Sequence, residues 1–303
     1  MSLATGRVPR SQRTFGEIKR EAIHTLKRSY KSDQFNHSMY CQQKAEEVRR
    51  TPAVFRVLGV QVHALQIPDV IHQMEAWISH RCDSHFIAVT NVHVLMEARH
   101  SLSFRRVLDS ADLCVPDGMP LVWIGRSRGY SLKQRVYGPD LLLDFCRETN
   151  AKGYRHFFYG GAPGVPEALV AKLKCQFPML EVAGTYSPPF RPLTPEEDAG
   201  IVEMINRAGA DVLWVGLGCP KQECWMYEHR EQLRVPVLVG VGQAFDLHAG
   251  RLKQAPSWMR GHGLEWLFRL LAEPRRLWRR YLIYNSEFVF SELLEFLGVK
   301  EFD

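Results

Sequence analysis

Short apolar segments alternate with amphipathic ones between residues 54 and 241, and this alternation allows few folds. The apolar runs, such as Phe86–Thr90 and Val235–Val241, indicate strands that are buried on both faces of a sheet. The segments between them, such as Pro68–His80, repeat apolar residues with the period of a helix. Strands separated by helices of this length predict an α/β fold, with a Rossmann-like, mostly parallel sheet and helices on both faces.

The same pattern predicts the bounds of the individual elements. Strands are expected at 54–62 (a strand or hairpin arm), 86–90, 113–115, 156–159, 180–183, 211–215 and 235–241. Helices are expected at 68–80, 92–99, 103–108, 141–150, 166–177, 195–208 and 222–232. Thr194 followed by Pro195 is typical of a helix N-terminus, so Thr194 is expected to cap the helix 195–208.

The charge of the chain is concentrated before this alternating region. Residues 1–50 contain eleven Lys or Arg and five Asp or Glu, which accounts for the whole net charge of +6. The rest is close to neutral, and this argues against a nucleic-acid partner. We expect residues 1–53 to be a basic, flexible extension with one helix near Phe15–Tyr30. Residues 54–250 should form the α/β core, and residues 251–303 a helical C-terminal appendage.

The appendage is expected to be helical from Leu252 onward, with breaks at Pro256 and Pro274. Its apolar stripe consists of Leu277, Trp278, Tyr281, Leu282, Phe288 and Val289. The arginines near this stripe are Arg269, Arg275, Arg276, Arg279 and Arg280. A basic, aromatic helix of this kind is able to lie in a membrane interface. On amphipathicity alone, packing against the core with the arginines in water is the favoured alternative.

Cysteine usage and hydropathy bear on the compartment. The seven cysteines are scattered and form no CxxC pair, which favours a reduced, cytoplasmic protein. No secretory signal is visible, and no apolar run reaches the roughly 18 residues of a membrane span. Any contact with a membrane is therefore expected to be peripheral.

Polar side chains follow several of the predicted strands at the points where they end. Thr90 and Asn91 follow one strand, Asp117 follows the next, and Asp246 follows the last. The carboxyl ends of parallel strands face the ligand crevice of an open sheet, so these residues are expected at a binding site. Asp117 is suited to accept a proton there, and the planar guanidinium of Arg135 is suited to hold a phosphate.

Each of these signals has an ordinary alternative. Asp117 and Asp140 are equally suited to cap helices. The loop 216–223 has glycines that let backbone N–H groups approach a phosphate or a uracil edge, but glycines after strands often only make turns.

Motifs for metals, dinucleotides and hydrolases are missing from the sequence. No HExxH, paired-cysteine, DxD or GxSxG pattern occurs. Gly160–Gly164 resembles a dinucleotide loop but lacks the GxGxxG spacing. Cys219 and Cys224 are interpreted as packing residues, since nothing places a base beside them. We therefore predict no metal site and no cofactor.

Six motifs occur in a fixed order, and together they are far more specific than any one alone. They are Asn91, Val115–Gly118 (VPDG), Arg135–Asp140 (RVYGPD), Gly218–Glu223 (GCPKQE), Gly240–Asp246 (GVGQAFD) and Gly263–Arg269 (GLEWLFR). Over residues 54–285 the chain thereby resembles the WecG/TagA/CpsF family of bacterial glycosyltransferases.

The resemblance implies an inverting, metal-independent transfer of a sugar in cell-surface polysaccharide biosynthesis. The implied donor is a UDP-sugar, commonly UDP-N-acetylmannosamine or its uronic acid, and the acceptor is a polyprenyl-diphosphate-linked saccharide. Asp117 is implied to be the catalytic base, and Arg135 to contact the diphosphate. Asn91, Gln222 and Asp246 are implied to bind the nucleotide sugar. The arginine-rich C-terminal region is implied to bind the anionic inner face of the cell membrane.

Three positions depart from the family pattern. Val89 stands where many members have threonine, which makes the neighbouring Thr90 the candidate for that substrate-binding role. Gln243 replaces a usual glycine, and Gln254 replaces an arginine, near the donor site and the appendage. The identity of the donor sugar is therefore left open. The sequence also does not determine the acceptor or the oligomeric state, and it is compatible with a homo-oligomer.

Three other functions fit parts of the pattern. A transferase of the same family that uses another donor, such as UDP-glucose, would be identified with a panel of nucleotide sugars. A UDP-binding regulatory module would bind UDP without transferring a sugar. A nicotinamide-dependent oxidoreductase would bind NAD, against which the missing GxGxxG spacing counts.

Overall fold

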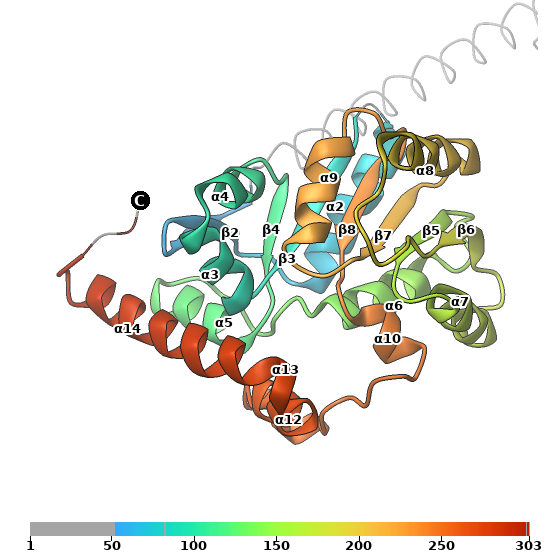
Figure 1. Cartoon of the computed structure of the whole chain (residues 1–303). Coiled ribbons are helices and arrows are strands. Elements are labelled where there is room, and N and C mark those ends of the chain that lie inside the picture. The colour runs from blue at the N-terminus through green and yellow to red at the C-terminus, as the bar shows by residue number, and fades with distance from the viewer. Residues whose placement is uncertain (1–51, 82, 301, 303) are drawn as a thin grey trace, which may run out of the picture. The chain divides into compact units, whose positions relative to one another are not determined.

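The computed structural model describes residues 52–81, 83–300 and 302 of the chain (Figure 1). Our expectations for residues 1–51, including the helix near Phe15–Tyr30, lie outside the described residues. From Pro52 onward the chain forms one compact unit, to which the helices after Gly250 also belong.

A six-stranded sheet lies at the centre of this unit, and all of its strand pairs are parallel. The strands are β3 (His85–Thr90), β4 (Leu113–Pro116), β5 (Arg155–Gly160), β6 (Glu181–Tyr186), β7 (Val212–Gly216) and β8 (Val237–Gly240), in the order β4-β3-β8-β7-β5-β6. β1 (Val54–Val57) and β2 (Val60–His63) form a separate antiparallel hairpin. The predicted α/β sheet is confirmed, and residues 54–62 take the hairpin alternative.

Helices cover both faces of the sheet, as predicted (Figure 1). One face is covered by the hairpin together with α3 (Val92–His100), α4 (Leu102–Asp109), α8 (Pro195–Ala208) and α9 (Lys221–His229). The other is covered by α2 (Ile67–His80), α6 (Gly138–Thr149), α7 (Val165–Gln176) and α10 (Ala244–His248). Successive residues of a strand enter opposite cores: Leu213 and Val215 enter the first, and Trp214 the second. This is why the strands are apolar along their length.

Helix ends show where local sequence signals were sufficient. The Thr194 hydroxyl accepts a hydrogen bond from the Glu197 N–H at 3.2 Å, so the predicted cap of α8 is confirmed. Asp140 lies inside the first turn of α6, whose N-cap is Tyr137, so Asp140 does not cap a helix. The five-residue α10 was not predicted, because so short a segment carries almost no helical period.

The appendage consists of short helices rather than long ones. They are α11 (Ser257–Gly261), α12 (Glu265–Ala272), α13 (Pro274–Arg279), a π-helical turn (Arg280–Tyr284) and α14 (Asn285–Phe296). The expected breaks at Pro256 and Pro274 are found, but Leu252–Ala255 is not helical, and a further break falls at Gly263. Within residues 52–81, 83–300 and 302, no helix is long and apolar enough to cross a bilayer.

Packing divides the apolar stripe that we expected along the appendage. Leu277 and Phe288 are buried, whereas Trp278, Leu282 and Val289 are exposed. α14 and the π-helical turn pack on α3. One apolar side of the appendage thus packs against the core, as the second alternative expected, and another is exposed at the surface.

Candidate active site

The order of the strands brings the carboxyl ends of β4, β3, β8 and β7 side by side, and the segments after them line one cavity of about 670 Å³. Asp117 follows β4, Asn91 follows β3, Asp246 lies in α10 after β8, and Gln222 lies in α9 after β7. Arg135, in the segment that leads into α6, lines the same cavity. The structure thus brings together five of the six residues predicted for the site.

Thr90 is the predicted residue that the structure places elsewhere. Its side chain is completely buried, and its hydroxyl donates to the Ala88 carbonyl oxygen at 3.1 Å. Val89 lines the cavity instead, because neighbouring side chains of a strand point to opposite faces. The position of Thr90 gives no support to the expectation that it binds substrate.

Asp117 lies at the end of β4, on a sharp turn. Its N–H donates to the Thr90 carbonyl oxygen at 2.7 Å, and Gly118 follows with a φ of +108°, a value that favours glycine. α5 (Met119–Ser127) begins next, with Gly118 and not Asp117 at its N-cap position. The turn therefore leaves the Asp117 carboxylate directed at the cavity rather than bound to a helix end.

The environment of Asp117 suits a proton acceptor. Burial raises its pKa to about 7, although Arg135 and a hydrogen bond from Asn91 act in the opposite direction. In the part of the chain that the structure describes, the Asp117 Oδ1 atom has no hydrogen-bond partner. A carboxylate with a pKa near neutrality and a free oxygen is suited to general base catalysis.

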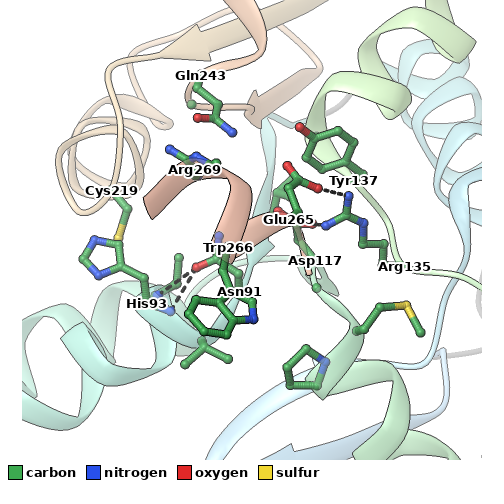
Figure 2. A pocket seen from close by; sticks show the side chains of 18 of the residues that line it. Asn91, His93, Asp117, Arg135, Tyr137, Cys219, Gln243, Glu265, Trp266 and Arg269 are labelled. Atoms are coloured by element: carbon green, nitrogen blue, oxygen red, sulfur yellow. Dashed lines mark hydrogen bonds and ion pairs between the residues drawn. The ribbon is translucent and has the colours of Figure 1, made fainter. Parts of the chain in front are cut away.

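Arg135 lies between two carboxylates (Figure 2). Its guanidinium forms an ion pair with Glu265 at the start of α12, while its Nη1 atom is 3.7 Å from Asp117 Oδ1. The guanidinium also lies over the Tyr137 ring, with 4.1 Å from Cζ to the ring centroid, a cation–π contact. Burial, followed by the Glu265 charge, raises the pKa of Tyr137, so this hydroxyl stays protonated.

Asn91 has a structural role that we did not predict, although an asparagine directly before the predicted helix 92–99 is a signal for it. Its Oδ1 atom accepts hydrogen bonds from the N–H groups of His93 and Val94, at 3.0 and 3.3 Å, and thereby caps α3. Since its side chain also lies against Asp117, Asn91 links the start of a helix to the candidate base.

Gln222 joins the two glycine loops of the cavity. Its Oε1 atom accepts from the Gly218 N–H at 3.2 Å and the Gly242 N–H at 3.0 Å, and its Nε2 atom donates to Glu223 at 2.8 Å. A Cβ atom on Gly240 would lie only 2.9 Å from Nε2, which explains a glycine there. The Gly218 N–H, one of those that we expected to face a ligand, is thus already bonded, and Gln222 links the two loops that line the cavity.

Comparison with known proteins identifies the family of the chain. Residues 55–301 match the Glycosyl transferase WecG/TagA/CpsF family. The chain belongs to this family and is a glycosyltransferase. The oxidoreductase alternative is thereby removed.

Two curated relatives of the glycosyltransferase carry the same name, N-acetylglucosaminyldiphosphoundecaprenol N-acetyl-beta-D-mannosaminyltransferase. The protein from Bacillus spizizenii is 34% identical over 197 residues, which cover 65% of this chain and 74% of the relative. The protein from Bacillus subtilis strain 168 is 32% identical over 196 residues, with the same two coverages.

The appendage of the glycosyltransferase supplies part of the cavity wall, which sequence reasoning missed. The contributing residues include Glu265, Trp266, Arg269, Arg276, Tyr281, Phe288 and Val289. Our sequence analysis placed these arginines at a membrane surface or in water, and not at the cavity. One signal was available: Glu265 and Arg269 are four residues apart and therefore share one face of α12.

Two further cavity residues refine the sequence reading. Cys219 lines the cavity, so packing does not fully describe it, whereas Cys224 packs against the first core. Gln243, the departure from the family pattern, also lines the cavity, and among the described residues nothing hydrogen-bonds to its buried Oε1 atom. Across the described residues, no cluster of three or more His, Cys, Asp or Glu is placed to hold a metal ion.

Proposed function

We propose that this glycosyltransferase moves N-acetylmannosamine or its uronic acid from a UDP-sugar to a polyprenyl-diphosphate-linked saccharide, in the synthesis of a cell-surface polysaccharide. The names of the two Bacillus relatives support the sugar and the acceptor. The observation that carries the proposal is the placement of Asp117, a carboxylate that is only 14% exposed and has a raised pKa, in a cavity that also presents arginine side chains.

The proposed reaction is a single displacement. Asp117 accepts the proton of an acceptor hydroxyl, and the hydroxyl oxygen forms a bond to the anomeric carbon of the donor sugar. The bond from that carbon to the diphosphate breaks, and its electron pair leaves with UDP. Because the oxygen attacks from the face opposite the leaving group, the configuration of the anomeric carbon is inverted.

The charge of the leaving diphosphate needs compensation, and arginines are the groups available. Arg135, Arg269 and Arg276 all line the cavity. Hydrogen bonds between guanidinium and phosphate groups are charge-assisted and often bidentate, so they stabilise a developing diphosphate charge effectively. We therefore propose a reaction that needs no metal ion.

The cavity lining has polar and apolar parts, which suit different substrates. Asn91, Gln243 and Asp246 provide polar groups, which suit a nucleotide sugar. Trp123 of α5 and Val289 of α14 provide apolar walls, and Val289 is 64% exposed, so this wall continues onto the surface of the appendage. We propose that the lipid-linked acceptor enters along these apolar walls.

The test is UDP release from a panel of UDP-sugars, with a short-chain prenyl-diphosphate-GlcNAc acceptor and with EDTA present. Acceptor-dependent release with UDP-N-acetylmannosamine or its uronic acid is expected. Release with UDP-glucose alone would identify UDP-glucose as the donor instead. Gln243, which departs from the family pattern and lines the cavity, would then be a candidate for this change of donor. UDP binding without release from any donor, with acceptors of several chain lengths, would favour the regulatory module.

The exposed apolar side of the appendage supports peripheral binding to the cytoplasmic face of the membrane. Its large residues are Trp278, Leu282, Ile283, Val289, Phe290 and Leu293, each between 46% and 64% exposed, and Arg275 and Arg279 are exposed nearby. Apolar groups that enter the lipid and arginines that meet anionic headgroups together favour an interfacial position.

Replacing Leu282 and Ile283 with serine should weaken co-sedimentation with phosphatidylglycerol vesicles by about tenfold or more, because two apolar side chains no longer enter the lipid. Leu102→Ser is the matched control, since Leu102 is 80% exposed but lies on α4, outside the appendage. Unchanged sedimentation of the double variant, or an equal loss in the control, would contradict the membrane proposal.

A further inference from the structure

Glu265 is a prominent residue of the GLEWLFR motif for which the proposed reaction has no use. It is the first residue of α12 and is 9% exposed, and its side chain forms an ion pair with Arg135 inside the cavity. A buried carboxylate on the arginine that should meet a diphosphate requires an explanation, since both are anions and compete for the same guanidinium.

The chain places Glu265 there by a specific turn. Gly263 has a φ of +72°, and a Cβ atom on it would lie 3.1 Å from both the Met119 Cβ atom and the Trp123 ring. The turn before α12 is thus packed directly on α5, the helix that begins immediately after Asp117 and Gly118. The turn that leads into α12 therefore packs on the helix that follows the candidate base, Asp117.

The contacts of Arg135 are unequal. The guanidinium is in direct contact with Glu265, but its closest approach to Asp117 is 3.7 Å, and in the described structure Asp117 Oδ1 accepts no hydrogen bond. Two carboxylates thus compete for one guanidinium, and Glu265 holds it (Figure 2). Without the Glu265 charge, Asp117 is the carboxylate left beside Arg135.

We propose that Glu265 is a positioning residue, which holds the Arg135 guanidinium away from Asp117 and so keeps the Asp117 carboxylate free to accept a proton. The inference rests on the proposed role of Asp117 as the base. Because Glu265 belongs to α12, the inference gives the appendage a part in keeping Asp117 ready to accept a proton.

The charges around Asp117 agree with this assignment. The groups that face it are Arg135 from the segment before α6, Glu265 and Arg269 from α12, and Asn91 from the start of α3. Burial is the main reason for the raised pKa of Asp117, Arg135 lowers it, and Glu265 raises it again. A higher pKa makes a carboxylate a stronger base, so the Glu265 charge favours proton removal.

The experiment compares the pH dependence of kcat for the full-length wild type, Glu265→Gln, Glu265→Asp and Glu287→Gln. In Glu265→Gln, Arg135 is free to pair with Asp117, so the acidic midpoint should fall by about one pH unit. kcat at pH 8 should fall about tenfold, while the Kd of UDP changes less than twofold. Glu265→Asp keeps the charge and should keep the midpoint of the wild type.

Glu287→Gln distinguishes the effect of the Glu265 charge from the effect of a loosened contact between the appendage and α3. Glu287 pairs with Arg99 and His100 and thereby joins α14 to α3, but it does not line the cavity. Its removal loosens the appendage without changing the charge beside Arg135, so the midpoint should not move. An unshifted midpoint in Glu265→Gln, or an equal shift in Glu287→Gln, would overturn the proposal.

A second measurement needs no turnover and distinguishes this proposal from the proposed function. Carbon-13 NMR of aspartate carboxyl groups, with Asp117 assigned through Asp117→Asn, reports the titration of this group directly. A lower Asp117 pKa in Glu265→Gln supports the positioning role even if no donor in the panel is used. An unchanged Asp117 pKa would refute it even in an active transferase.

Discussion

Asp117→Asn should lower the turnover of the glycosyltransferase by at least about 10²-fold while UDP binding is retained, since asparagine has the shape of the base but accepts no proton. The wild type should itself lose activity as the pH falls through about 7, where Asp117 becomes protonated. Initial rates with the donor identified by the panel, together with calorimetric titration of UDP, measure both quantities. Near-normal turnover in the variant would remove Asp117 from this role.

Stability provides the control for that variant. Because the pKa of Asp117 is raised from 3.8 to about 7 in the folded protein, the native state keeps a proton there that the unfolded chain has released. The contribution of this group to stability therefore falls as the pH rises between these values and is lowest above pH 7. Asp117→Asn should thus unfold at a higher temperature than the wild type at pH 8, with a smaller difference at pH 4. Asp144→Asn, on the outer side of α6, should show neither effect.

Much of the fold was predictable because its determinants are local or periodic. The segment 68–80 was predicted from apolar residues that repeat with a helical period, and four of them on α2, Val70, Ile71, Met74 and Ile78, are buried. The capping of α8 by Thr194 follows from adjacent residues alone. The order of the strands in the sheet was not predictable in this way, because it depends on pairing between strands that are far apart in the chain. The period of the apolar residues contains no information about that pairing.

The candidate site was predictable where a residue directly follows a strand, as Asn91 and Asp117 do. The structure gives no support to Thr90, because a shift of one residue turns a strand side chain to the opposite face, where the Thr90 hydroxyl bonds to the Ala88 carbonyl oxygen. The sequence analysis missed Glu265 because this residue is more than a hundred positions from Arg135, and only the Gly263 turn onto α5 brings the two together. Motif order alone contains no information about such contacts.

Arg135→Ala should lower kcat/KM by about 10²- to 10³-fold, because the proposed leaving diphosphate loses a preorganised cation. UDP binding should weaken as well, since the same guanidinium meets the ground-state diphosphate. Arg135→Lys keeps a positive charge without the planar fork and should lose less activity than the alanine variant. Arg147→Ala is the matched control, because Arg147 is an exposed arginine of α6 that pairs with Asp144. Unchanged UDP affinity and turnover in Arg135→Ala would contradict the assignment.

The pH dependence of Arg135→Ala makes this prediction sharper. Arg135 lowers the pKa of Asp117, whereas Glu265 raises it. Removal of the arginine should therefore move the acidic midpoint of the rate profile to a higher pH, opposite to the shift expected for Glu265→Gln. If Arg135 acted only as a remote charge for the nucleotide, the affinity for UDP would change and the midpoint would not. Opposite shifts in the two variants require that both side chains act on the same carboxylate, and this is what the contacts among Asp117, Arg135 and Glu265 predict.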